Sequence, residues 1–259
     1  ASDVYKIQLL DRTMKINKLL KKTGTERVIL SDICEVMSDI LESTVLVLSK
    51  KGKLLAQFTK DSIEPIDELF VTEDGELIDG QLNERLLSIL STKENINLVT
   101  LGFSKEYTEK GYLGMVAPID IAGERLGTLV MYRTNHPYDI EDIILGEYGS
   151  TVVGLEIMRS INEENSEEMR KSTIVKSAIS TLSFSEQEAI KHIFDELDGS
   201  EGILVASKVA DRVGITRSVI VNALRKFESA GVIESRSLGM KGTYIKILND
   251  ILKEEVDKI

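Results

Sequence analysis

Three polar side chains near the C-terminus have the types and the spacing that can read DNA. Ser218 and Asn222 lie one turn apart on the face of an expected helix that points away from Ile220 and Leu224, and Arg217 projects from the first turn. Arginine pairs with guanine and asparagine with adenine through two hydrogen bonds in the major groove. Recognition helices read bases from their N-terminal half. We therefore expect Arg217, Ser218 and Asn222 to contact base edges.

The segment that holds these side chains has the pattern of a helix-turn-helix. Ala210 is small enough for two helices to touch, Gly214 tolerates the positive φ of the turn, and Thr216 is a typical N-cap for the second helix. An earlier helix is expected to open with a capping box of Ser185 and Glu188. The apolar residues expected to face inward are Val209, Val213, Ile215, Ile220 and Leu224. An αα-hairpin that packs only against protein is the alternative.

A two-stranded wing is expected after the second helix. Val232–Arg236 and Thr243–Leu248 have the composition of strands, and Leu238–Gly242 has that of a turn. Basic side chains outside the recognition face more simply meet phosphates than bases. The remaining expected DNA contacts are Arg225, Arg236 and Lys241 on phosphates, together with Ala206, Ser207, Lys208 and Thr216.

The distribution of charge confines nucleic-acid binding to this segment. The 259 residues carry a net charge of −11, yet Ala206–Lys246 contains eight basic and three acidic residues. That local charge of +5 leaves −16 for the rest of the chain. An acidic body with one basic segment fits a protein that binds DNA through a single element. The basic excess also disfavours the reading of these side chains as ordinary solvated residues.

Residues for catalysis or metal binding are scarce. His136 is expected in a loop before Pro137 and His192 on a helix surface, while the single cysteine, Cys34, is expected to be a small buried hydrophobe. No long apolar run and no secretory signal is visible. We therefore expect no catalytic residues, no metal site, no cofactor and no membrane partner, in a cytoplasmic protein that is not an enzyme.

Helices and locally paired strands alternate in the N-terminal part, which predicts an α+β sensor-like domain. The expected helices are Ile7–Leu20, Ser31–Leu41 and Leu82–Leu90. The expected strands are Thr44–Leu48 and Leu54–Phe58, which form a hairpin, then Asn97–Phe103, Met115–Ile121 and Thr128–Arg133, the last two joined through Ala122–Gly127. A proline-free helical pattern from Asp139 to Leu182 then predicts one long connecting helix. Its acidic interruption at Glu163–Glu168 is most simply a solvated face.

Several stretches of the chain are similar to one known family. They are Arg212-Val213-Gly214-Ile215-Thr216-Arg217-Ser218-Val219-Ile220, Leu238-Gly239-Met240-Lys241-Gly242-Thr243-Tyr244, Gly123-Glu124-Arg125-Leu126-Gly127-Thr128 and Glu147-Tyr148-Gly149. Together they resemble the CodY family, global repressors of Gram-positive bacteria that sense GTP and branched-chain amino acids. The resemblance implies a GAF-type effector-binding domain in residues 1–138, a linker helix in 139–182 and a winged helix-turn-helix DNA-binding domain in 183–259.

The resemblance implies a site for isoleucine, leucine or valine in the GAF domain. Such a ligand needs a cation for its carboxylate and an apolar cavity for its side chain. Arg85 is the matching cation on an otherwise apolar helix face, although without the family it would be read as a surface arginine. Asn95-Ile96 stands where the family has an aromatic residue followed by proline. The other matching residues are Leu86, Ile89, Val99, Thr100, Leu101, Gly102 and Phe103.

A GTP site between the GAF domain and the linker helix is also implied. Lys50, Lys51 and Lys53 could meet phosphates, although a basic hairpin turn is usually just solvated. The other matching residues are Ser49, Val28 and Leu30, with Glu156 as a partner for the base or the ribose. Ile161 stands where the family has a lysine. The glycine-containing segment Gly123–Thr128 lacks the Gly-Lys-Ser/Thr of a P-loop, so no GTP hydrolysis is expected.

These features predict a homodimeric transcriptional regulator, mainly a repressor, that binds operator double-stranded DNA. Branched-chain amino acids and GTP are the expected effectors that raise its affinity. Two other function classes remain open from the residues. One is a sensing enzyme that uses its winged helix to bind a partner, and a GTP turnover assay would detect it. The other is an architectural DNA binder without an effector, which a thermal shift with isoleucine would distinguish from a sensor.

Overall fold

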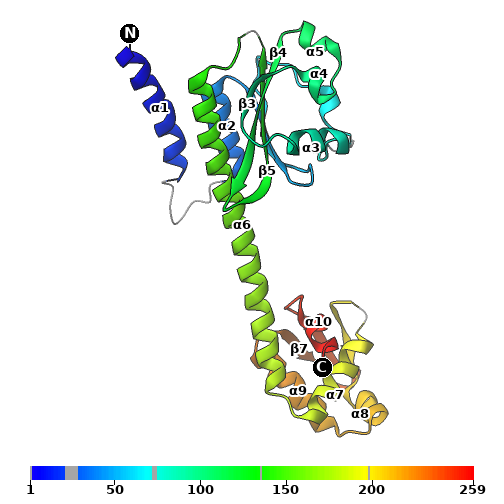
Figure 1. The fold of residues 1–259 in the computed structure, drawn as a ribbon. Coiled ribbons are helices and arrows are strands. Elements are labelled where there is room, and N and C mark those ends of the chain that lie inside the picture. The colour runs from blue at the N-terminus through cyan, green and yellow to red at the C-terminus, as the bar shows by residue number, and fades with distance from the viewer. Residues whose placement is uncertain (1, 21–28, 72–74, 135, 198) are drawn as a thin grey trace. The chain divides into compact units, whose positions relative to one another are not determined.

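The chain forms two compact units, Ala1–Ile161 and Asn162–Ile259, which we call the first and the second unit. The computed structural model describes residues 2–20, 29–71, 75–134, 136–197 and 199–259. Helix α6 (Ile140–Ser180) begins in the first unit and ends in the second (Figure 1). Val28, one of the expected GTP contacts, lies outside the described residues.

A five-stranded antiparallel sheet forms the centre of the first unit, with the strand order β2-β1-β5-β4-β3. Its strands are β1 (Thr44–Ser49), β2 (Leu54–Phe58), β3 (Lys93–Ile96), β4 (Tyr112–Ile121) and β5 (Glu124–Thr134). Successive side chains of a strand point to opposite faces. Val45 and Val47 of β1 therefore enter one core, and Leu46 and Leu48 enter the other.

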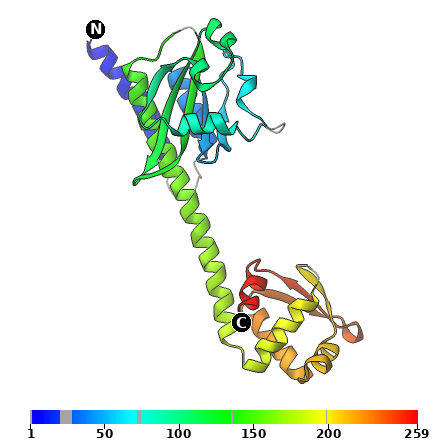
Figure 2. The same ribbon diagram turned by 45° about the vertical axis from the view of Figure 1, so that its right-hand side comes forward.

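Helices cover both faces of this sheet (Figure 2). On the Val45 face lie α1 (Ser2–Leu20), α2 (Leu30–Leu41) and the first part of α6. On the Leu46 face lie the 3-10 turn Asp67–Leu69, α3 (Gly80–Leu87), α4 (Leu98–Leu101) and α5 (Lys105–Glu109). Gly149 and Gly154 let α6 lie close to its neighbours, because a Cβ at these positions would overlap Met37 and Ile121.

The second unit is a helix-turn-helix joined to a three-stranded sheet of order β6-β8-β7. Its elements are α7 (Phe184–Glu196), β6 (Glu201–Leu204), α8 (Ala206–Val213), α9 (Arg217–Ser229), β7 (Ile233–Ser237), a 3-10 turn (Gly239–Lys241), β8 (Thr243–Ile247) and α10 (Leu252–Asp257). Phe194 and Phe227 stack in its core, and the last part of α6 adds Val175 and Ala178. The β7–β8 hairpin forms the expected wing.

The α+β class, the long helix and the winged helix-turn-helix are confirmed, but some local predictions are wrong. Asn97–Phe103 is not a strand, because the Asn97 side chain accepts the Val99 N–H (3.0 Å) and caps α4. The turn expected over Ala122–Gly127 shrinks to Ala122 and Gly123, both with positive φ, so β5 begins at Glu124.

Helix starts and one edge strand also differ from the prediction. The capping box of α7 is formed by Ser183 and Glu186, two residues before the predicted pair. Both pairs have the same spacing, and the tertiary bond from Lys226 to Glu186 (2.7 Å) favours the observed one. Asp79 caps α3 and Leu87 ends it, so this helix begins and ends earlier than Leu82–Leu90. Strand β6 is too short to show a pattern and was not predicted.

Candidate DNA-binding surface and effector sites

Helices α8 and α9 meet at a tight turn that presents one side of α9 to solvent. Gly214 has φ +73°, and the N–H groups of Gly214 and Ile215 both donate to the Ala210 carbonyl (3.0 and 3.1 Å). Ala210, Ile220 and Leu224 are buried. The predicted base-reading residues are all exposed on the other side: Arg217, Ser218 and Asn222. The structure thus brings these three side chains onto one accessible surface.

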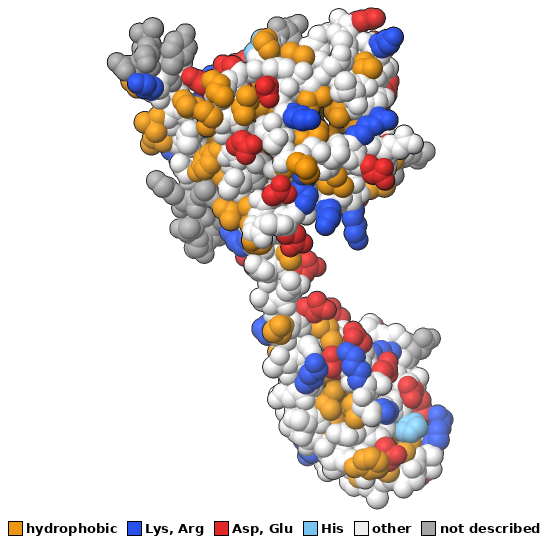
Figure 3. All heavy atoms as spheres, in the orientation of Figure 1, with side chains coloured by type: hydrophobic (Ala, Val, Ile, Leu, Met, Phe, Trp, Pro, Cys, Tyr) orange, Lys and Arg blue, Asp and Glu red, His pale blue; other side chains and the backbone are white. Residues whose placement is uncertain are grey.

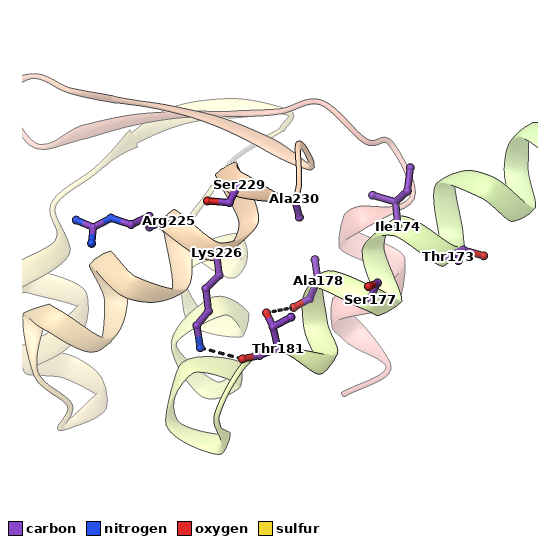
Figure 4. A pocket seen from close by; sticks show the side chains of 9 residues that line it. All are labelled: Thr173, Ile174, Ser177, Ala178, Thr181, Arg225, Lys226, Ser229 and Ala230. Carbon is purple, nitrogen blue, oxygen red and sulfur yellow. Dashed lines mark hydrogen bonds between the residues drawn. The ribbon is translucent and has the colours of Figure 1, made fainter.

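The basic side chains of the second unit divide into a paired and an unpaired set. Arg212 pairs with Glu196, and Lys226 Nζ donates to Glu186 Oε2 (2.7 Å) and to the Thr181 carbonyl (2.8 Å). Figure 4 shows Lys226 turned toward Thr181 beside a groove of about 650 Å³ between α6 and α9, while Arg225 points away. Among the described residues, no ion pair involves six exposed cations: Lys208, Arg217, Arg225, Arg236, Lys241 and Lys246. The first five were predicted to contact DNA, and Lys246 was not.

The tip of the wing lies beside the start of α8. Thr243 of β8 pairs with Leu204 of β6, two residues before α8 begins. Gly242 has φ +111°, and a Cβ there would overlap the Leu204 carbonyl, so the wing turn is held against the end of β6. Lys241 and the exposed Lys208 therefore come from adjoining elements. The first N–H groups of a helix also attract phosphates.

Two predicted DNA contacts are placed differently from the other exposed side chains. The Ala206 side chain is buried in the core, so only its backbone N–H at the start of α8 remains for DNA. Thr216 is the N-cap residue of α9 as predicted, but its hydroxyl is hydrogen-bonded to that of Ser218 (2.8 Å) and to no backbone N–H. Thr216 therefore holds the predicted N-cap position without a side-chain capping bond.

An apolar cavity lies between α3, α4 and the sheet of the first unit. It is lined by Ile66, Leu69, Leu82, Leu86, Leu98, Leu101, Phe103, Gly114, Val116, Val130, Met131 and Tyr132. Its volume of about 10 Å³ is room for roughly one water molecule. A branched aliphatic side chain would enter only after part of the wall has moved. The cavity has the apolar lining that such a ligand needs, but it is closed.

Arg85 lies beside this cavity and bridges α3 to α4. Its Nη1 donates to the Leu101 carbonyl (2.7 Å). Gly102 has φ +103°, and a Cβ there would overlap Nη1, so the glycine leaves room for the guanidinium group. Among the described residues no carboxylate pairs with Arg85, which is exposed. Its remaining N–H groups are available for an incoming carboxylate.

The other predicted amino-acid contacts do not all face the cavity. Leu86, Leu101 and Phe103 line it, and Ile89 is buried in the same core. Val99 is exposed, and the Thr100 hydroxyl, also on the exposed side of α4, donates to the Asn97 carbonyl. The structure therefore brings Arg85 and the apolar residues together and leaves Val99 and Thr100 outside.

The lysine turn predicted to meet GTP phosphates connects β1 to β2. The Ser49 N–H donates to the Lys53 carbonyl (2.8 Å), and Gly52 has φ +79°. Lys53 pairs with Glu76 (3.2 Å). Lys50 and Lys51 are exposed, with no ion pair in the described part of the chain. The turn thus offers two free ammonium groups on a defined backbone.

The β4–β5 hairpin lies between this turn and α6. The Leu126 carbonyl accepts the Lys50 N–H (3.1 Å), and Ile121 lies against Gly154 of α6. Glu156, two residues further on, is 14% exposed at its side chain and pairs with Arg159 (3.3 Å). The two remaining positions of the predicted site lie on helices: Leu30, half-buried at the start of α2, and Ile161, exposed on α6.

Two arginines near these sites were not predicted to matter. Arg125 donates to the carbonyls of Leu86 (3.4 Å) and Ile89 (3.1 Å) near the end of α3, and burial lowers its pKa. Arg133 is 3% exposed and pairs with Asp142 (2.6 Å) in the first turn of α6. Arg125 lies within the family-like segment Gly123–Thr128, which gave a signal, whereas no spacing in the sequence marks Arg133.

Comparison with known proteins decides the family. The model described as CodY GAF-like domain matches residues 8–181, and that described as CodY helix-turn-helix domain matches residues 200–258. The chain belongs to the CodY family. The global transcriptional regulators CodY of Clostridium tetani (strain Massachusetts / E88) and Clostridium kluyveri are each 50% identical to it over 97% of this chain and 98% of theirs. Among solved structures, the cofactor binding GAF domain of the nutrient sensor CodY from Clostridium difficile is 31% identical, with a TM-score of 0.45, covering 61% of this chain and 99% of that one.

Membership of the CodY family confirms the resemblance seen in the residues. The CodY GAF-like match covers the first unit from residue 8 and continues along α6 to residue 181, and the CodY helix-turn-helix match lies within the second unit. The CodY relatives are named as transcriptional regulators, and theirs is not a family of enzymes. In the described part of the chain, no helix is long and apolar enough to cross a membrane, and no group of three potential ligands could hold a metal ion.

Proposed function

We propose that this member of the CodY family is a homodimeric transcriptional regulator, mainly a repressor, that works in the cytoplasm. Branched-chain amino acids and GTP raise its affinity for operator DNA. Residues 1–138 bind the effectors, residues 139–182 connect, and residues 183–259 bind DNA. The observation that carries the proposal is the set of exposed, unpaired cations around the recognition helix α9. DNA is the partner that such a surface fits.

On the DNA side, the two kinds of contact come from different elements. Arg217, Ser218 and Asn222 on α9 read base edges, and Arg225 on the same helix meets a phosphate. Contacts to the DNA backbone also come from Arg236 and Lys241 of the wing. Others come from the starts of α8 and α9: Ala206, Ser207, Lys208 and Thr216. Lys241→Ala should weaken binding to specific and to random DNA equally. It should also reduce the slope of log affinity against log salt concentration by about 1.

On the effector side, the carboxylate of isoleucine, leucine or valine binds the Arg85 guanidinium, and the ligand side chain enters the cavity beside Leu86. The support is the apolar lining and the position of Arg85 next to it. Leu101, Gly102 and Phe103 close the site around the ligand, with Ile89 behind it and Val99 and Thr100 on the α4 side. Since the cavity has a volume of only about 10 Å³, ligand binding must open it.

The phosphates of GTP bind the free ammonium groups of Lys50 and Lys51, assisted by Ser49 and Lys53. Glu156 is the partner for the base or the ribose, and Val28 and Leu30 flank the nucleotide. The hairpin contact between the lysine turn and α6 supports this location. Replacing all three lysines should weaken GTP binding and leave isoleucine binding unchanged. Equal loss of both would indicate misfolding, whereas unchanged GTP binding would remove the turn from the site.

A second copy of the chain covers the apolar surface that α1 and the start of α6 leave open. Orange side chains lie over the α1 side of the first unit (Figure 3), and the exposed apolar residues of these two helices include Ile7, Leu10, Met14, Ile140 and Ile144. A dimer would place two recognition helices against the two halves of a palindromic operator. Light scattering of the full chain measures this directly, and a monomer at micromolar concentration would contradict it.

The deciding experiment is calorimetric titration of the full chain with isoleucine, leucine, valine and GTP, separately and together. Isoleucine should bind the wild type and the Lys105→Ala control, whose exposed cation lies on α5. Arg85→Ala should lower the affinity by about 2–5 kcal/mol, because the ligand carboxylate loses its partner. Undiminished binding to Arg85→Ala would remove Arg85 from the site. No binding of any effector to the wild type would leave a DNA binder without a sensor.

A further inference from the structure

We propose that Asn95 is a positioning residue that ties the movable wall of the apolar cavity to the first turn of α6. The inference rests on the proposed effector function and adds a route by which a ligand in the cavity reaches the long helix. Asn95 lies on β3, three residues before Leu98 of the cavity wall. It contacts the chain again at Tyr138, two residues before α6 begins.

The side-chain amide of Asn95 makes two hydrogen bonds to the backbone of Tyr138, one to its carbonyl and one from its N–H. Asn95 Nδ2 donates to the Tyr138 carbonyl (2.9 Å), and the Tyr138 N–H donates to Asn95 Oδ1 (2.7 Å). Asn95 has φ +52°, a conformation that asparagine tolerates better than most residues. The β3–β4 register shifts between Lys93 and Ile96, which turns the Asn95 side chain away from the regular ladder.

We call the two bonds between Asn95 and Tyr138 the tie. On its far side, Tyr138 is fixed to the start of α6. Its ring is 4% exposed, its hydroxyl is bonded to Ser43 (2.8 Å), and the Arg133 guanidinium lies 4.0 Å from the ring centroid. Arg133 also pairs with Asp142, and Asp139 Oδ1 accepts the N–H groups of residues 141 and 142. Tyr138 and the first turn of α6 are therefore bonded as one group, and a pull on Tyr138 acts on the helix start.

On the cavity side, α4 is the wall that can move. Val116 and Val130 belong to β4 and β5, each of which pairs with a neighbour on both sides. Leu98 and Leu101 belong to α4, a helix of four residues. One bond that holds α4 runs from Arg85 to the Leu101 carbonyl. A ligand carboxylate that takes over the Arg85 guanidinium would release that bond while its side chain pushes α4 outward.

A cavity lies beside the tie, so Asn95 is the bridge between the β3–α4 segment and the segment before α6. A cavity of about 290 Å³ lies between the N-cap of α4, α5 and the segment before α6, and it is lined by Asn97, Thr108, Gly111, Tyr112, Leu113, His136 and Pro137. Among the described residues, side chains do not fill this gap, so displacement of the start of α4 is not passed on by packing there. The two bonds of Asn95 cross from β3 to Tyr138 directly. Movement of α4 and of the end of β3 therefore reaches α6 through Asn95.

The test compares Asn95→Gly with Asn97→Ala in the full chain. Glycine accepts the positive φ at position 95 and removes both bonds to Tyr138. Asn97→Ala is the matched control, because it also removes two side-chain bonds, to the Val99 N–H (3.0 Å) and the Thr108 hydroxyl (2.7 Å), but none to Tyr138. Two quantities are measured: amide hydrogen exchange without effector, and isoleucine affinity with and without operator DNA.

Asn95→Gly should speed exchange at residues 139–145 at least several-fold, whereas Asn97→Ala should speed it only in α4. Isoleucine affinity without DNA should stay within a few-fold of the wild type in both variants. The ratio of isoleucine affinities with and without operator, typically about 5–150 for coupled sites, should fall toward 1 in Asn95→Gly and persist in Asn97→Ala. Asn95→Asp keeps the acceptor for the Tyr138 N–H and should give an intermediate ratio.

Unchanged exchange at residues 139–145 in Asn95→Gly, or an equal increase in Asn97→Ala, would overturn the tie. A full affinity ratio in Asn95→Gly would overturn it as well. If the wild type binds no isoleucine, the proposed effector function fails, and the exchange comparison alone then decides whether Asn95 holds the helix start. The two failures are therefore distinguishable.

Discussion

The proposed DNA-binding surface and the proposed amino-acid site differ in whether their side chains already have bonding partners within the protein. Around α9, the predicted contacts Arg217, Asn222 and Arg225 are exposed, with no ion pair among the described residues. In the first unit, Arg85 is bonded to Leu101 and the cavity is closed. The proposed DNA contacts need no rearrangement, whereas the proposed amino-acid site would have to exchange internal contacts for ligand contacts. In such a protein, ligand binding changes internal contacts at the closed site and not at the DNA-binding surface.

The largest effect is expected where the two regions are joined. Two glycines inserted between Glu163 and Ser166 should interrupt α6, which is continuous from Ile140 to Ser180. Coupling between effector and operator, typically about 1–3 kcal/mol, should vanish while each separate binding reaction stays largely unchanged. Effector affinity measured with and without operator, in both proteins, tests this. Coupling that survives the insertion would favour direct contact between the domains over a rigid helix.

A comparison of two arginines tests whether unpaired cations are the ones that bind DNA. Arg217→Ala should cost about 1–3 kcal/mol at a specific operator and less on random DNA, because a base contact is lost. Arg212→Ala is the matched control, since Arg212 pairs with Glu196 and should change operator affinity little. Fluorescence anisotropy at two salt concentrations measures both. If Arg217→Ala weakens specific and random binding by the same factor, Arg217 does not read bases.

Gly102→Ala tests whether this glycine holds the Arg85 guanidinium beside the cavity. Alanine there must adopt φ +103° and would overlap Arg85 Nη1, so the bond from Arg85 to Leu101 should break. The strain should destabilise the first unit by about 1–3 kcal/mol and leave the second unit unaffected. Calorimetric melting separates the units, and isoleucine titration should show weaker binding. A Gly102→Ala protein that melts and binds like the wild type would mean that Arg85 is not held as described.

The sequence predicts elements well where a local pattern decides them. The apolar run of β1, the turn glycine Gly214 and the small Ala210 each reflect a requirement met within a few residues, and the structure confirms all three. The same holds for Cys34, which is buried with its pKa raised to about 12 by desolvation. The fold class, the long helix and the helix-turn-helix follow from such patterns.

Features that depend on distant contacts could not be predicted. The Arg85 bond to Leu101 and the Asn95 bonds to Tyr138 join residues 16 and 43 positions apart. No spacing in the sequence shows that the cavity is closed, because its volume depends on how α3, α4 and the sheet pack. The start of α7 was misplaced for the same reason, since two equivalent capping boxes were available and a bond from Lys226 distinguishes them.

The smallest expected effect concerns a paired cation of the second unit. Burial raises the pKa of Glu186, but hydrogen bonds from Lys226 and Ser183 outweigh it, so the pKa lies below its usual range. A carboxylate with a lowered folded pKa stabilises the fold above its unfolded pKa, about 4.3, and this contribution is lost as the pH falls through the folded value. Glu186→Gln should therefore lower the melting temperature at pH 7, and the difference from the wild type should shrink toward pH 3.

Glu188→Gln is the control for this variant, because Glu188 is exposed on the same helix and, among the described residues, has no ion-pair partner. Operator affinity at neutral pH should be the same in both variants, since Lys226 serves α7 and not DNA. A difference between Glu186→Gln and the wild type that persists unchanged at pH 3 would show that charge is not its source. An operator affinity that rises in Glu186→Gln would mean that the released Lys226 joins the unpaired set, so pairing to Glu186 is what separates the two sets of cations.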